Sequence, residues 1–206
     1  MTHLVASLSM VGALSLPLVS TADDDFDHWE TNYNLRHGDF GGQLRVDIGK
    51  PNNDHIQLSW YDIFDTEFRF DFRYVNNQDT PEYRPRISYE GWKWGRTVTF
   101  KLKPRLEYRI FDGDEKNDYS RIQLIPSING KAAERWTLWG EFEPSWNVFG
   151  SGDGQNDFGI DSSKLVVGTS YKISKNVSFG PFVEYDMDKD WHKKDLFTGT
   201  NLSITF

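Results

Sequence analysis

Hydrophobic and polar residues alternate without a break along residues 96–111, the longest regular run in the chain. Successive side chains of a β-strand point to opposite faces, so this run predicts one strand with an apolar face and a charged face. The apolar set is Val98, Phe100, Leu102, Pro104, Leu106, Tyr108 and Ile110, and the polar set is Thr97, Thr99, Lys101, Lys103, Arg105, Glu107 and Arg109. At about 3.3 Å per residue, the strand is long enough to cross a bilayer while tilted.

The same alternation recurs along the chain, separated by turn and loop residues. The further stretches are 43–48, 55–61, 67–74, 83–90, 121–126, 135–146, 164–172, 177–185 and 196–206, with a less regular one at 28–36. Connections alternate between short and long, as in barrels with one periplasmic and one extracellular side. The pattern therefore predicts an all-β protein, a closed antiparallel transmembrane β-barrel of 10–12 strands.

The strand number follows from the segment at 28–36. Bacterial single-chain barrels have an even number of strands, which rules out eleven. We expect ten strands if residues 28–36 continue their neighbour through a bulge, and twelve if the pattern hides one more.

The first 22 residues differ from the rest. They contain no Lys, Arg, Asp or Glu, residues 4–18 are mostly apolar, and Ser20, Thr21 and Ala22 fit a cleavage site. This predicts a secretory signal peptide at residues 1–22, followed by a single barrel domain at 23–206. A transmembrane anchor is the alternative, but the apolar run is short and interrupted by Ser and Pro.

Composition narrows the class further. The mean hydropathy of -0.63 excludes a helical membrane protein but not a barrel, whose apolar residues occupy alternate positions. The absence of Cys argues against a disulfide scaffold and against zinc–thiolate sites. The net charge of -8 disfavours a nucleic-acid partner. No metal and no cofactor is expected.

Basic residues dominate the inward positions of adjacent predicted strands and predict a pore-lining substrate track. They are Arg69, Arg73, Arg84, Arg86, Lys101, Lys103, Arg105, Arg109 and Arg121. Glu141, Glu143 and Glu184 are expected to form an opposing acidic wall. Charges this dense are costly to bury dry, which favours a water-filled lumen, although a plugged barrel with a salt-bridge network is the alternative.

The C-terminal half carries a resemblance to a known family. The motifs are the stretches 83–89 and 103–109, the stretch 163–173 with the turn Ser174-Lys175-Asn176, the stretch 179–185, and a last strand ending in Phe206. They resemble the KdgM-type oligogalacturonate-specific porins and, more distantly, OmpG-type porins, over residues 82–206. The resemblance implies a 12-stranded monomer whose basic residues pass acidic oligosaccharides. A terminal Phe is also the signal that outer-membrane barrels present to their assembly machinery, and we assign this role to Phe206.

These observations predict a porin in the outer membrane of a Gram-negative bacterium, inserted in lipid as a monomer. It would pass anionic oligosaccharides such as oligogalacturonate by diffusion and would not be an enzyme. The alternatives are an outer-membrane barrel enzyme, for which His192 lies beside Asp188, Asp190 and Asp195, and a non-conducting structural or adhesion barrel. A soluble ligand-binding barrel would leave Lys101, Lys103, Arg105 and Arg109 outside.

Overall fold

A computed structural model describes residues 28–48, 54–76, 80–112, 118–150 and 159–206, so the predicted signal peptide at residues 1–22 lies outside the described residues. The structure is almost entirely β-strand. The strands are β1 His28–His37, β2 Phe40–Ile48, β3 Asp54–Trp60, β4 Phe68–Asn76, β5 Glu82–Tyr89, β6 Trp92–Trp94, β7 Val98–Phe111, β8 Tyr119–Lys131, β9 Trp136–Gly150, β10 Gly159–Lys172, β11 Val177–Asp188 and β12 Lys193–Thr205. One short 3₁₀ turn, η1 Ile63–Asp65, joins β3 to β4. No helix in these ranges is long and apolar enough to cross a membrane.

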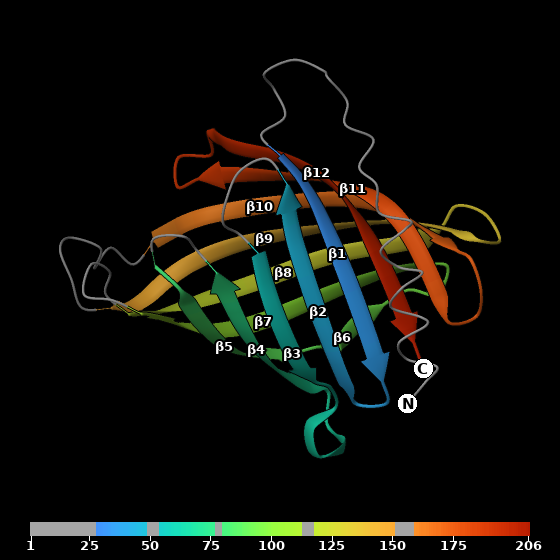
Figure 1. Cartoon of the computed structure of the whole chain (residues 1–206), viewed down its shortest axis with the longest axis horizontal. Coiled ribbons are helices and arrows are strands. Elements are labelled where there is room, and N and C mark those ends of the chain that lie inside the picture. Colours follow the sequence, from blue (N-terminus) through green and yellow to red (C-terminus); the bar gives the residue numbers. More distant parts are fainter. Residues whose placement is uncertain (1–27, 49–53, 77–79, 113–117, 151–158) are drawn as a thin grey trace.

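The strands close into a barrel, which confirms the predicted fold class. The other neighbouring strands of the wall pair in antiparallel fashion, whereas β1 pairs with β12 in parallel, from His28 opposite Phe197 to Arg36 opposite Thr205 (Figure 1). The closed wall has 11 strands, so the expectation of an even number was wrong. An even count is required only where the first and last strands run antiparallel, and here they do not.

The short strand β6 extends the edge of β5 along β7. Ser88 lies opposite Arg105, and Trp92 lies opposite Leu102. The chain therefore advances by four residues on the β5–β6 side and by three residues on β7. One extra residue on one side of an antiparallel pair is a β-bulge. The β5–β6 segment therefore forms one wall strand, and the chain turns into β7 at Gly95, whose φ is +91°.

The outer surface carries the apolar residues that the alternation predicted. Large hydrophobic side chains on the strands are exposed all around the wall, among them Leu44, Leu58, Phe70, Ile87, Phe100, Leu106, Ile122, Leu138, Leu165 and Val183. The buried positions are instead mostly polar or charged, including Glu30, Arg45, Asp71, Arg86, Glu107 and Glu184. This inverted distribution is that of transmembrane strands, with lipid outside and a polar interior.

The two rims of the barrel differ. The C-terminal rim carries Phe206, the tight turns at 38–39, 132–135 and 173–176, and the η1 turn, which projects beyond the ends of β3 and β4 (Figure 1). The opposite rim carries the start of β1 and the β11–β12 turn at 189–192. Phe206 donates its backbone N–H to the carbonyl of Arg36 at 2.9 Å, which ties the chain end to β1.

A small apolar cluster fills part of the interior on the β9–β12 side. Trp139 lies with its ring 6.4 Å from the ring of Phe182, and both rings occupy space left by inward-facing glycines. A Cβ on Gly168 would lie 2.5 Å from Trp139 Cζ2 and 2.8 Å from Phe182 Cβ. The absence of a side chain at Gly168 is thus required by the close approach of the two rings.

We expect Gly168→Ala to destabilise the barrel by about 1–3 kcal/mol, because overpacking forces neighbouring side chains from their positions. The matched control is Gly140→Ala on β9, where a Cβ would meet nothing closer than 3.6 Å and the change should stay within about 0.5 kcal/mol. Urea unfolding of the refolded protein, followed by tryptophan fluorescence, measures both. Equal stability of the two variants would contradict this packing account.

Candidate functional site

The lumen contains two adjoining cavities, one toward each rim. The cavity toward the opposite rim has a volume of about 530 Å³, and the cavity toward the C-terminal rim about 450 Å³. A single set of residues lines both, and we call it the constriction ring: Arg45, His55, Arg73, Arg86, Arg105, Glu143, Lys164 and Glu184. These side chains lie where the two cavities adjoin.

Basic side chains outnumber acidic ones in the constriction ring. Arg73, Arg86 and Arg105 project from the neighbouring strands β4, β5 and β7. The ring's other cations, Arg45 and Lys164, lie on β2 and β10, and its carboxylates Glu143 and Glu184 lie on β9 and β11. The narrow part of the lumen therefore carries a positive balance, although the whole chain is acidic.

The predicted track residues divide between the two cavities and the ring. Arg73, Arg86 and Arg105 line both cavities, Arg84, Arg109 and Arg121 line only the one toward the opposite rim, and Arg69 only the one toward the C-terminal rim. Lys101 and Lys103 line a separate space of about 90 Å³ with Glu90 and Glu141. The structure thus brings most of the track together and sets the two lysines to one side.

Two of the three expected acidic residues adjoin the basic track. Lys103 Nζ lies 3.4 Å from Glu141 Oε2, and Arg105 Nη1 lies 3.6 Å from Glu143 Oε2, so both pairs reach from β7 across β8 to β9. Glu184 on β11 lies farther round the wall. Lys164 donates to it at 2.5 Å.

The sequence interpretation did not assign a role to Arg45 or Lys164. Arg45 is only 8% exposed and pairs with Glu30 on β1, with Asp47 at 3.1 Å on its own strand, and with Glu184 at 3.9 Å. The inward position of Arg45 was readable from the alternation of residues 43–48. Its place in the ring was not, because it depends on β2 reaching β11 across the β1–β12 pair.

The cavity toward the opposite rim is lined by an alternating ladder of charges. Arg84 pairs with Glu82 at 2.5 Å, Arg109 with Glu107 at 2.7 Å, and Arg121 with Asp161. The buried Nε atoms of Arg84, Arg86 and Arg121 nevertheless have no hydrogen-bond partner among the described residues. These Nε atoms are closed to a solute, whereas the guanidinium edges that line the cavity can bind a planar carboxylate through two hydrogen bonds.

Asp71 on β4 anchors the basic cluster. It is fully buried, and its Oδ1 accepts hydrogen bonds from Ser59 Oγ at 2.5 Å, Arg69 Nε at 2.7 Å and Gln57 Nε2 at 2.9 Å. Arg86 Nη2 lies 3.6 Å from the other carboxylate oxygen. One buried carboxylate therefore fixes side chains from β3, β4 and β5.

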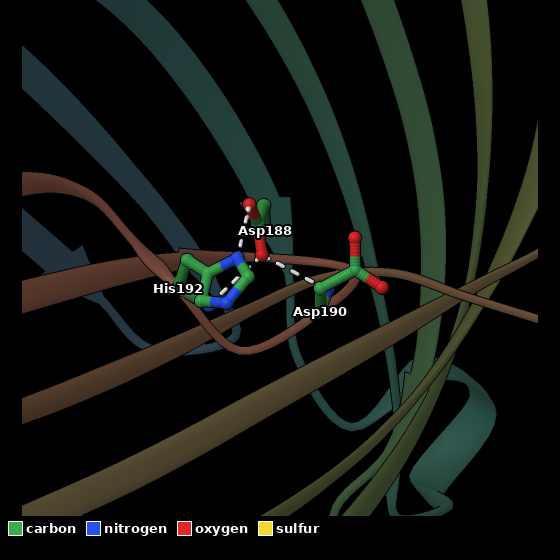
Figure 2. Close-up of side chains that lie close together, drawn as sticks. All are labelled: Asp188, Asp190 and His192. Atoms are coloured by element: carbon green, nitrogen blue, oxygen red, sulfur yellow. Dashed lines mark hydrogen bonds and ion pairs between the residues drawn. The ribbon is translucent and has the colours of Figure 1, made fainter.

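The acidic turn at the opposite rim has a structural explanation. Asp188 Oδ1 accepts the backbone N–H groups of Asp190 and His192, each at 2.9 Å, and His192 Nδ1 lies 3.6 Å from Asp188 Oδ2 (Figure 2). The turn also places Trp191 at a φ of +65°. Asp188 thus caps the β11–β12 turn, and His192 is exposed on the rim.

No known family model matches the chain, and no curated protein is similar enough to count as a match.

Asp71→Ala should destabilise the barrel by about 3–5 kcal/mol, because removing one partner leaves the buried Arg69 and Arg86 without their shared acid. Glu134, exposed in the β8–β9 turn, offers the control, and Glu134→Ala should stay within about 0.5 kcal/mol. Urea midpoints of the folded protein in detergent micelles compare the two. If Asp71→Ala proved as mild as Glu134→Ala, Asp71 would not be the anchor.

Proposed function

We propose that this protein is an outer-membrane porin that lets anionic oligosaccharides, such as oligogalacturonate, diffuse through a lumen lined by basic residues. The barrel fold is compatible with an outer-membrane channel, and the likeness of residues 82–206 to the KdgM-type porins supports the substrate class. In this proposal the protein is a monomer, and the oligosaccharide crosses by passive diffusion without a cofactor.

The constriction ring carries this proposal. It lies between the two cavities and holds more cationic than anionic side chains, which favours anions over cations at this point of the lumen. In such a confined space the Coulomb interaction is stronger than in bulk water. The preference for Arg over Lys in the ring favours a carboxylate, which a guanidinium binds through two parallel hydrogen bonds.

The distribution of charge around the lumen supports an extended acidic sugar over a small inorganic anion. The arginines of β4, β5, β7 and β8 run from one cavity through the ring into the other. A chain of uronic acids presents carboxylates at intervals, and successive arginines can exchange them. Among the carboxylates that line the same space, Glu184 and Asp186 on β11 lie near Lys164 and away from these arginines.

The refolded protein should form discrete channels in a planar bilayer, with a reversal potential that favours anions under a salt gradient. Arg73→Gln should lower the ratio of anion to cation permeability about twofold or more, since it removes a charge from the ring. Lys175→Gln, in the exposed β10–β11 turn, removes the same charge and should leave the ratio unchanged. Channels that favour cations would overturn the basic-track proposal, and well-folded protein without channels would favour a plugged barrel.

Oligogalacturonate added to one side should block the current in resolvable events, and an uncharged glucose oligomer of the same length should not. The blocks should weaken as salt rises from 0.1 to 1 M, because the screening length falls from about 10 Å to about 3 Å. Block frequencies at both salt concentrations measure this. Equal block by the two sugars would mean that the channel selects its solute by size and not by charge.

A further inference from the structure

One neutral side chain lies between two arginines of the constriction ring. Gln57 Oε1 accepts hydrogen bonds from Arg73 Nε at 3.1 Å and Arg73 Nη2 at 2.9 Å, and it also accepts one from Arg86 Nη2. Gln57 is 3% exposed and lies on β3 directly opposite Arg73 on β4. Two cationic groups therefore share a single uncharged acceptor.

The chemistry of the neighbours fixes the orientation of the Gln57 amide. Its Nε2 group donates to Asp71 Oδ1 at 2.9 Å and to Ser59 Oγ at 3.0 Å. Since a carboxylate accepts and a guanidinium only donates, the nitrogen has to face Asp71 and the oxygen has to face the arginines. The amide thus serves as a fixed bridge between the buried acid and the ring.

The pairing of Arg73 differs from that of the other ring arginines. Arg45, Arg86 and Arg105 each have at least one carboxylate within 4.0 Å. No carboxylate of the described residues comes within this distance of Arg73, whose hydrogen bonds go to Gln57. The positive charge of Arg73 is held in place without being cancelled.

We propose that Gln57 is a specificity-determining residue of the pore, because it fixes the side chain of Arg73 without neutralising it and so leaves the charge of Arg73 available to a passing carboxylate. This inference rests on the proposed function. A glutamate at the same position would have the same length, and one of its oxygens would form salt bridges with Arg73 and Arg86 while the other would replace the N–H donor to Asp71. The glutamate carboxylate would then occupy the guanidinium donors of the constriction ring. A carboxylate of the solute would be repelled by it and would have no free donor to bind.

The test is Gln57→Glu, measured as the ratio of anion to cation permeability and as the rate of block by oligogalacturonate. We expect the ratio to fall at least about threefold and the block to become correspondingly rare. Gln43→Glu is the matched control. Gln43 faces Gln57 across the β2–β3 pair, but its hydrogen bonds go to Asn34 at 2.8 Å and His55 at 3.0 Å and to no arginine among the described residues. It should change the ratio by less than half as much.

A second variant separates charge from packing. Gln57→Met keeps the volume and the neutrality but loses the acceptor, so it should retain anion selectivity while making the block by oligogalacturonate shorter-lived. Equal effects of Gln57→Glu and Gln43→Glu, or a loss of selectivity in Gln57→Met, would overturn the role of Gln57 while leaving the porin intact. A wild-type protein that does not conduct, or that favours cations, would instead overturn the proposed function itself.

Discussion

Closure of the sheet is the constraint on which the rest of the structure depends. A wall that faces lipid has no water to satisfy its backbone N–H and C=O groups, so every strand needs a partner on both sides. With an odd number of strands that alternate in direction, the last gap can be closed only by a parallel pair, β1 with β12. The lumen depends on this pair, because Arg45 on β2 reaches Glu184 on β11 only across it.

The interior charges are tolerated because most of them form ion pairs. A net positive charge remains in the lumen because not every arginine has a carboxylate partner. Breaking a buried ion pair is costly, and residues such as Asp71 hold several neighbours at once. Around Arg73 the pairing is different, since a neutral amide takes the place of an acid. Order and net charge are therefore supplied by different residues. This division lets the lumen stay structurally firm and still keep a positive charge that no described carboxylate neutralises at Arg73.

The strand pattern was readable from the sequence because side chains of transmembrane strands alternate strictly, and all eleven stretches, including residues 28–36, lie in strands of the barrel wall. The even-number rule misled the strand count, because the direction of the closing pair leaves no trace in hydrophobic periodicity. The basic residues of β4 to β8 were likewise visible as inward positions. Arg45 was passed over because its neighbours in space are distant in sequence, and Gln57 because an uncharged residue gives no signal until its two arginines are seen around it.

The parallel pair of β1 and β12 has a further consequence for the orientation of the chain. In a barrel closed by antiparallel strands, the polypeptide enters and leaves the wall at the same rim. Here β1 begins at the rim opposite Phe206. In a wall that spans a membrane, His28 and Phe206 would therefore lie on different sides of it, and the barrel would connect the two.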